Sequence, residues 1–220
     1  MAIAFPGEND TYRHARNTLL EAEAQLRTQV EAVAALRRQL PLGGRIPEDY
    51  LFEEDAGGVR LSQLYKTGQP TLLMYNFMYG PAMKEACPLC TSILDGLNGT
   101  APHVMDRMQL VIVAKSPMPR IREYMRERGW NNLRFVSSAA NSYNRDYHGE
   151  DEKGSQFPML NVFVRRDDGI YHTYGTELFF AAREKGQDAR HVDIIWPLWN
   201  LFDFTPEGRG SQWYPKLRYR

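Results

Sequence analysis

Two short segments of the chain are apolar almost from end to end. Residues 72–77 read Leu-Leu-Met-Tyr-Asn-Phe, and residues 109–114 read Gln-Leu-Val-Ile-Val-Ala. A strand that is covered on both faces of a sheet has such a near-continuous apolar pattern. We therefore predict that both segments are buried strands, and residues 133–137 are predicted to form a shorter one.

Two further segments place turn residues between strand-like stretches. Residues 50–61 contain Gly57-Gly58, which predicts a small hairpin with a Gly-Gly turn. Residues 159–174 contain Asp167-Asp168-Gly169, which we predict to make the turn, because Asp-Gly between two strand-like stretches is a strong hairpin signal. We therefore predict one β-hairpin early in the chain and a second one late in it.

Apolar residues recur every seven positions over residues 10–40, which predicts one long helix with a seam like that of a coiled coil. Asn9 is a suitable cap at its start, and Pro41 ends it. The chain thus divides into a helical extension, residues 1–44, and a domain, residues 45–220. The seam can pack on that domain or on a second copy of the chain, which would give a homodimer, since periodicity does not name the partner. The heptad positions are Tyr12, Leu19, Leu26, Val33 and Leu40.

Shorter helices are predicted inside the domain. Amphipathic or helix-forming patterns cover residues 90–97 and 119–128. Residues 139–156 are polar and contain Asn and Gly, so we expect a loop with a helical piece. Residues 192–202 are rich in aromatic and aliphatic side chains, but Pro197 argues against one uninterrupted helix there.

Charge and composition exclude several classes of protein. The 27 basic and 27 acidic residues cancel, so we do not expect the basic surface of a nucleic-acid binder. No segment approaches the roughly 18 apolar residues of a membrane span. Residues 1–8 lack the basic start and apolar core of a signal peptide. We therefore predict a cytoplasmic protein that binds neither nucleic acid nor membrane.

The strongest chemical signal is Cys87-Pro88-Leu89-Cys90, which contains the only two cysteines of the chain. The motif stands between a predicted strand and a predicted helix. A thiolate at a helix N-terminus has a lowered pKa and is a better nucleophile at neutral pH. A second thiol nearby can then resolve a mixed disulfide. Lys84 is a further candidate for lowering the pKa of Cys87.

Three other interpretations of the cysteines remain open. A zinc site needs four ligands, and no pair of histidines has the spacing that would complete it. A structural disulfide across so short a loop removes little entropy from the unfolded chain. The cysteines can also be buried and inert. We predict no metal, and no organic cofactor either, because no phosphate-binding glycine motif is present. The histidines considered for zinc are His103, His148, His172 and His191.

The order of elements resembles the thioredoxin fold. A strand leads into the C-x-x-C helix, a second strand and helix follow, and Phe157-Pro158 precedes the late hairpin. The resemblance implies an α/β fold in which helices flank a mixed central sheet. It also implies that Phe157 and Pro158 bind substrate beside Cys87, with a cis peptide bond before the proline. The alternative is an ordinary trans proline at the start of a strand.

Short motifs along nearly the whole chain resemble one bacterial thioredoxin-like family. That family is described as a domain of unknown function or as predicted dithiol-disulfide oxidoreductases, and it also begins with a long helix. The motifs are Asp49-Tyr50-Leu51-Phe52, Tyr75-Asn76-Phe77-Met78-Tyr79-Gly80, Cys87-Pro88-Leu89-Cys90, Val136-Ser137-Ser138, His172-Thr173-Tyr174 and Phe202-Asp203-Phe204-Thr205-Pro206-Glu207-Gly208-Arg209.

The resemblance implies an enzyme that exchanges thiols and disulfides, with Cys87 as attacking thiolate and Cys90 as resolving thiol. Its substrate would be a protein or small-molecule thiol or disulfide. A peroxiredoxin-like peroxidase is one alternative, but Pro81 is six residues before Cys87 instead of seven, and Lys84 replaces the hydroxyl residue of that motif. A non-catalytic interaction protein is the other alternative, and burial of Cys87 would favour it.

Overall fold

A computed structural model describes residues 3–208, 210 and 212–219. The chain divides into two compact units, Met1–Pro41 and Leu42–Arg220. The main element of the first is the helix α1 (Asp10–Gln39), and the second contains the sheet and every other helix named below. No helix in the described part has the length and apolar character that crossing a membrane requires.

The long N-terminal helix is present as predicted. The side chain of Asn9 caps α1 by accepting a hydrogen bond from the backbone N–H of Tyr12 at 2.8 Å. No residue of α1 is buried, and the exposed fractions of Leu19 and Leu26 are 52% and 63%. Packing of this seam against another surface therefore stays a prediction.

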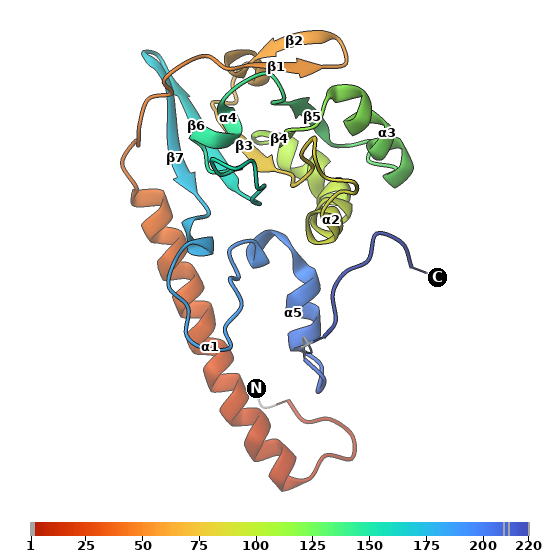
Figure 1. Ribbon diagram of the computed structural model, residues 1–220. Helices are drawn as coiled ribbons and strands as arrows, with labels where there is room; N and C mark the ends of the chain where they lie inside the picture. Colours follow the sequence, from red (N-terminus) through yellow and green to blue (C-terminus); the bar gives the residue numbers. More distant parts are fainter. Residues whose placement is uncertain (1–2, 209, 211, 220) are drawn as a thin grey trace. The chain divides into compact units, whose positions relative to one another are not determined.

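The second unit is built on a seven-stranded sheet in the order β2-β1-β5-β4-β3-β6-β7 (Figure 1). The three strands β3, β4 and β5 run parallel, and the remaining pairs are antiparallel. The strands are β1 (Leu51–Glu54), β2 (Gly57–Arg60), β3 (Thr71–Asn76), β4 (Gln109–Ala114), β5 (Arg134–Ser137), β6 (Leu160–Arg166) and β7 (Gly169–Gly175).

This unit has a thioredoxin-like fold, as predicted. The parallel strands β3 and β4 are joined through a helix, α2 (Pro88–Met105), and β3 also pairs with the antiparallel hairpin of β6 and β7. The helix α3 (Met118–Arg128) joins β4 to β5, and Gly129 ends it with a φ of 68°. The short helix α4 (Tyr143–Asp146) lies in the segment predicted as a loop with a helical piece.

Both predicted hairpins form. The turn of the first lies two residues earlier than the predicted Gly57-Gly58, and the turn of the second lies within the predicted Asp167-Asp168-Gly169. In the first hairpin Gly57 pairs with Glu54, so the loop consists of Asp55 and Ala56. Gly57 has a φ of 116°, a conformation that favours glycine. In the second hairpin Gly169 pairs with Arg166. The glycines are therefore the first residues of the returning strands instead of the turns themselves.

Each face of the sheet has its own apolar core. Along β4, Leu110 and Ile112 point to one core while Val111 and Val113 point to the other. The first core is completed by α2, α3 and the C-terminal segment, and the second by the β1–β2 hairpin, α4 and the 3-10 helix η1 (Leu61–Leu64). Burial on both faces explains why β4 is apolar throughout, since no side of it meets water.

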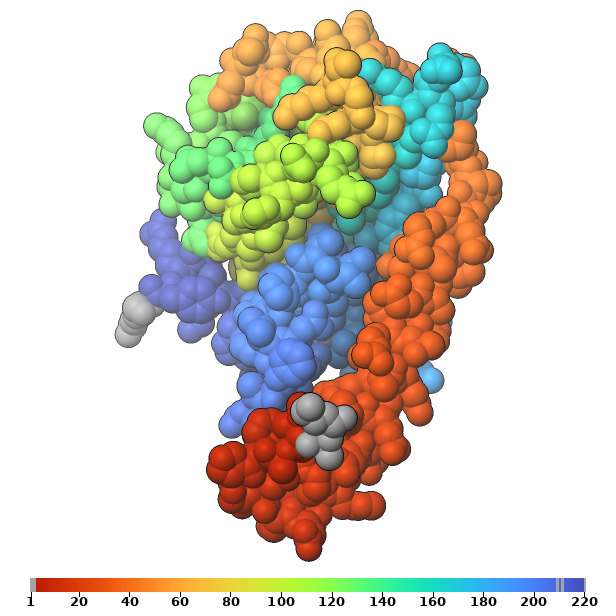
Figure 2. Space-filling model, turned by 180° about the vertical axis from the view of Figure 1, so that it is seen from behind, coloured from red at the N-terminus to blue at the C-terminus, as the bar shows by residue number. Residues whose placement is uncertain are grey.

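The C-terminal segment lies against α2 (Figure 2). It contains the 3-10 helices η2 (Glu177–Phe179) and η3 (Asp193–Ile195) and the helix α5 (Pro197–Asp203). Pro197 is the first residue of α5, where the missing N–H of proline costs no hydrogen bond. The predicted interruption at this proline is therefore confirmed. Arg209, the last residue of the motif that begins at Phe202, lies outside the described residues.

Candidate functional site

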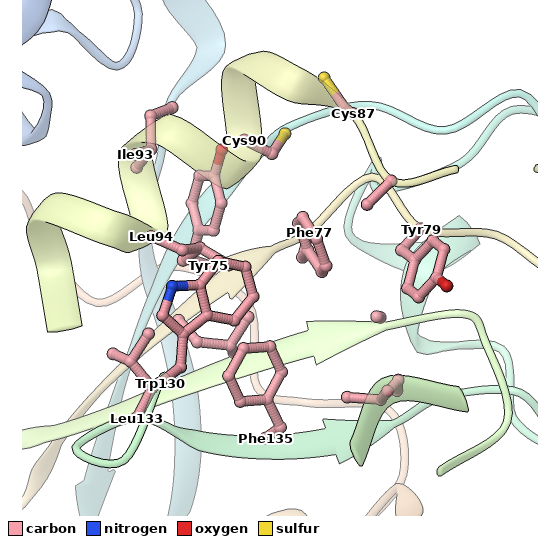
Figure 3. Packing of buried hydrophobic residues seen from close by; sticks show 14 of the residues in the cluster. Tyr75, Phe77, Tyr79, Cys87, Cys90, Ile93, Leu94, Trp130, Leu133 and Phe135 are labelled. Carbon is pink, nitrogen blue, oxygen red and sulfur yellow. The ribbon is translucent and has the colours of Figure 1, made fainter. Parts of the chain in front are cut away.

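The two cysteines lie at the start of α2 and one turn into it (Figure 3). Cys87 is the N-cap residue and Pro88 is the first helical residue, a position that proline favours. The helix runs to Met105 and is longer than the predicted 90–97. The reason is that buried residues continue at helical spacing through Cys90, Ile93, Leu94 and Ala101, and this packing outweighs the low helix propensity of the glycines between them.

Both cysteines are free thiols and both are largely buried. The exposed fraction is 8% for Cys87 and 1% for Cys90. By the criterion stated above, burial of Cys87 favours a non-catalytic protein. However, both residues line a cavity of about 510 Å³, so they face an internal space and not only packed side chains.

The surroundings of Cys87 stabilise its thiolate. A hydrogen bond from the side chain of Cys90 contributes most, and it lowers the pKa of Cys87 to about 6 against the opposing effect of burial. The backbone N–H groups of Cys90 and Leu89 and the hydroxyl of Tyr214 act in the same direction. The N–H groups do so from the first turn of α2, although neither makes a capping hydrogen bond of standard geometry. These groups take the role predicted for Lys84.

Cys90 has the opposite character. Burial raises the pKa of its thiol well above the usual value, and the neighbouring Cys87 sulfur raises it further. The buried hydroxyl of Tyr75, on β3, points toward Cys90 (Figure 3), although it completes no hydrogen bond of standard geometry with a described residue. One thiol of the pair is therefore ready to attack at neutral pH, and the other keeps its proton.

Phe157 and Pro158 line the same cavity as the cysteines, which is the neighbourhood predicted for them. The peptide bond between them is trans, so the expectation of a cis bond is wrong. The trans geometry suits the local structure. The N–H of Phe157 donates to the carbonyl of Gly149 at 2.9 Å, and the carbonyl of Met159 accepts from Asn76 of β3 at 2.7 Å. The proline thus precedes an ordinary strand pairing.

Arg120, on α3, fixes the loop that leads into the motif. Its guanidinium donates to the carbonyls of Gly80 at 3.1 Å and Lys84 at 3.0 Å, and also to the carbonyl of Met83. The same group lies 4.1 Å from the centroid of the Tyr79 ring. Sequence analysis did not single out Arg120, because nothing local distinguishes it from the other arginines of its helix.

Sequence analysis also missed the outer wall of the cavity. The C-terminal segment supplies most of it, and the aromatic side chains in an otherwise polar stretch were the available signal. Their role as a wall of the cavity becomes visible only in the structure, where they line the same cavity as Cys87. The aromatic members of this wall are Phe179, Trp196, Trp199, Trp213 and Tyr214.

Of the histidines considered for zinc, one lies at the cavity of the cysteines. His191 lines the cavity, whereas His172 lies on β7 and contacts Asn161, with 3.0 Å between its Nε2 and Oδ1 of Asn161. In the described part of the chain, no three His, Cys, Asp or Glu side chains form a group that could hold a metal ion.

Comparison with known proteins gives a family match. A family model described as "Bacterial protein of unknown function (DUF899)" matches residues 4–219. No curated protein matches the chain.

Solved structures with a similar chain path are peroxiredoxins and related proteins. Peroxidoxin BcpB from Mycobacterium tuberculosis is 15% identical with a TM-score of 0.48, and the match covers 72% of this chain and 95% of that one. A mutant of peroxiredoxin Q from Xanthomonas campestris is 16% identical with a TM-score of 0.46, covering 74% and 97%. Thioredoxin peroxidase I from Plasmodium yoelii is 14% identical with a TM-score of 0.47, covering 80% and 100%. Similarity at this level leaves the chemistry of the site to be judged from its own residues.

Proposed function

The chain belongs to the DUF899 family of bacterial proteins of unknown function, and we propose that it is a thiol-disulfide oxidoreductase. One observation carries the proposal. Cys87 is the N-cap residue of α2, Cys90 lies one turn into the same helix, and both residues line a cavity. This arrangement pairs a stabilised thiolate with a protonated second thiol within one helical turn.

The first step uses the thiolate of Cys87. It attacks one sulfur of a substrate disulfide R–S–S–R′, a Cys87–S–S–R bond forms, and the substrate S–S bond breaks. The departing R′–S⁻ takes a proton from water. The lowered pKa of Cys87 keeps this group ionised at neutral pH, which is what the attack requires.

The second step uses Cys90. Its sulfur attacks the Cys87 sulfur, a Cys87–Cys90 disulfide forms, and the bond to R breaks. The proton of Cys90 passes to the departing R–S⁻. Two electrons have then moved from the protein dithiol to the substrate. A dithiol reductant then reduces the Cys87–Cys90 disulfide and restores the dithiol. The cytoplasm, the location we propose, is a reducing compartment that supplies thiols of this class.

Single cysteine variants test this proposal by intact mass. Cys90→Ser should accumulate a mixed disulfide at Cys87, because the resolving thiol is gone, and Cys87→Ser should not exchange at all. The wild-type protein should form an intramolecular disulfide with a potential of about −270 to −120 mV. Failure of the wild-type protein to form this disulfide under mild oxidants would reject the proposal in favour of a non-catalytic role.

A second candidate function is reduction of a peroxide at Cys87. The observation that favours it is the hydroxyl of Tyr214 beside the Cys87 sulfur, which can donate to a peroxide oxygen. In this reaction the Cys87 thiolate attacks one peroxide oxygen, the O–O bond breaks, and the departing RO⁻ takes a proton from water to give ROH. The Cys87 sulfenate formed takes up a proton, and the Cys90 thiol then attacks its sulfur, so that the Cys87–Cys90 disulfide forms and water leaves. Mass spectrometry of Cys90→Ser after brief peroxide treatment should show one added oxygen, at a rate well above that of a free thiol. Reaction no faster than that of a free thiol excludes this candidate.

We also propose that the protein forms a homodimer through α1. The heptad seam is exposed, with Leu19, Leu26 and Leu40 at least half exposed. A heptad seam packs against another helix with the same repeat. A second copy of the chain has an identical helix, so two chains can pair through α1 as a symmetric dimer.

A further inference from the structure

Two parts of the fold line the cavity beside the cysteines. The start of α2 and Phe157-Pro158 form its floor, and the C-terminal segment forms its outer wall. Trp213 and Tyr214 belong to that wall, and the Tyr214 hydroxyl contacts the Cys87 sulfur. Cys87 is only 8% exposed, and a small molecule of suitable size fits within the space that it lines.

The outer wall is mainly aromatic. The ring centroids of Trp196 and Trp199 are 5.2 Å apart, and those of Trp199 and Trp213 are 5.5 Å apart. Phe179 of the wall and Phe157 of the floor have ring centroids 5.8 Å apart. Aromatic rings offer a large apolar surface with few rotatable bonds, so they bind apolar groups at low entropic cost.

The guanidinium of Arg190, which lines the cavity, is already paired with carboxylates of the protein. Arg190 forms ion pairs with Asp193 at 3.5 Å and with Asp203 at 3.2 Å. A guanidinium held between two carboxylates is a poor anchor for the carboxylates of a charged disulfide such as glutathione disulfide. We therefore expect this wall to bind a substrate mainly through the apolar groups of that substrate.

The volume of the cavity agrees with a small substrate. About 510 Å³ lies within the usual range of small-molecule sites, roughly 300–1,000 Å³. A larger cavity of about 830 Å³ lies near Pro88, but neither cysteine lines it, and its walls carry charged groups such as Lys84, Glu123 and Arg128. Of these two cavities, only the aromatic one brings a ligand to the sulfur of Cys87.

We propose that the substrate of the exchange reaction is a small disulfide with an apolar, aromatic body, which binds between the tryptophans of the C-terminal segment and Cys87. This inference rests on the proposed function. The S–S bond of the substrate would lie at Cys87, and its apolar group would lie against Trp199 and Trp213.

Three disulfides with leaving thiols of similar basicity test the proposal by stopped-flow oxidation of the reduced protein. They are dibenzyl disulfide, the polar hydroxyethyl disulfide and the charged glutathione disulfide. The rate constant of each disulfide with the protein is divided by its rate constant with a free thiol. This ratio should be about tenfold higher or more for dibenzyl disulfide than for either of the others. Trp213→Ala should reduce that ratio, because it removes apolar surface from the wall. The matched control Phe204→Ala, at a side chain that is 81% exposed and outside the cavity, should leave the ratio unchanged.

A binding measurement separates this inference from the redox proposal. Dibenzyl sulfide, a thioether that cannot exchange, should quench the tryptophan fluorescence of the Cys87→Ser variant in a saturable titration. Adding Trp213→Ala should weaken the binding, so that saturation needs a higher concentration of the thioether. Saturable binding without any disulfide exchange would reject the redox proposal and leave an apolar ligand site. Exchange with equal rates for all three disulfides, together with no saturable binding of the thioether, overturns the substrate inference alone.

Discussion

The indole Nε1 of Trp196 donates a hydrogen bond to the hydroxyl of Ser92 across 3.1 Å, and this bond joins the C-terminal segment to the helix that carries both cysteines. Trp196 is only 3% exposed, so its N–H has little access to water. The bond therefore fixes the wall of the cavity relative to Cys87 and Cys90. Because a buried N–H group without an acceptor is costly, the indole of Trp196 is held in this position.

Ser92→Ala should destabilise the protein by about 1–3 kcal/mol, because it leaves a buried indole N–H without an acceptor. Chemical denaturation would measure this loss, and proteolysis should cut the C-terminal segment sooner. Thr100→Ala is the matched control on the same helix. The Thr100 hydroxyl is exposed and bonds only to Leu97 of its own turn, so we expect a change within about 0.5 kcal/mol. Equal stability of the two variants would contradict the role assigned to Ser92.

The reactivity of Cys87 should depend on pH with a midpoint near its pKa of about 6. Only the thiolate is alkylated, so the rate should fall as the pH drops through this value and reach a plateau above it. Cys87 should also be labelled before Cys90 at pH 7, since burial raises the pKa of Cys90. Iodoacetamide labelling followed by peptide mass spectrometry measures both.

In the Cys90→Ala variant the midpoint should move to higher pH by about one unit or more, because the thiolate loses its strongest hydrogen bond. A midpoint that stays in place would mean that the helix N-terminus, and not Cys90, stabilises the thiolate. Preferential labelling of Cys90 in the wild-type protein would reverse the roles proposed for the two cysteines.

Tyr214→Phe should raise the pKa of Cys87 by a smaller amount than Cys90→Ala does. The hydroxyl of Tyr214 is one of several groups that lower this pKa, and phenylalanine keeps the ring while removing the donor. The same labelling profile measures the shift. Tyr219→Phe is a control in the same segment, at a side chain that is 65% exposed. Identical profiles for the two variants would remove Tyr214 from the site.

Much of the fold could be predicted because it depends on local patterns. The strands β3 and β4 were found from apolar runs, and the position of the cysteines at a helix start followed from the strand before them. The turn of the first hairpin was misplaced, because glycine at positive φ can occupy the strand position Gly57 as well as a turn. Local sequence does not distinguish these two uses.

The outer wall of the candidate site could not be predicted for a different reason. The contact between Tyr214 and Cys87 joins residues far apart in the sequence, and the residues around Tyr214 have no periodic pattern that marks one face. The trans bond before Pro158 was missed because the resemblance to thioredoxins suggested a cis bond, while the isomer depends on tertiary contacts such as the one between Phe157 and Gly149.

Leu26→Glu should shift the protein from dimer to monomer if α1 pairs with a second copy, because a charge in an apolar seam opposes pairing. Leu26 belongs to the first of the two compact units, so the fold of the second unit should keep its thermal stability. Sedimentation velocity gives the oligomeric state. Thr28→Glu, exposed on the same helix but outside the seam, should remain a dimer. A wild-type monomer at micromolar concentration would reject the pairing.

Arg120→Met should destabilise the protein by about 2–3 kcal/mol and should also alter the pH profile of Cys87. The guanidinium donates to the carbonyls of Gly80, Met83 and Lys84, and methionine cannot replace a charged donor to these groups. The freed loop would change how the N-terminus of α2 presents the Cys87 sulfur, so Arg120 acts as a positioning residue.

The neighbouring Arg122 provides a matched control for this last prediction. It pairs with Asp55, but the side chains of this pair are 46% and 59% exposed, so Arg122→Met should cost less than about 1 kcal/mol. Urea denaturation and the iodoacetamide profile of Cys87 should be measured on both variants. Because a purely structural role would lower the stability without moving the midpoint of the profile, an unchanged midpoint in Arg120→Met would restrict this arginine to holding the loop. Lysine at this position should recover only part of both effects, since an ammonium group cannot reach the three carbonyls in the geometry that the planar guanidinium provides.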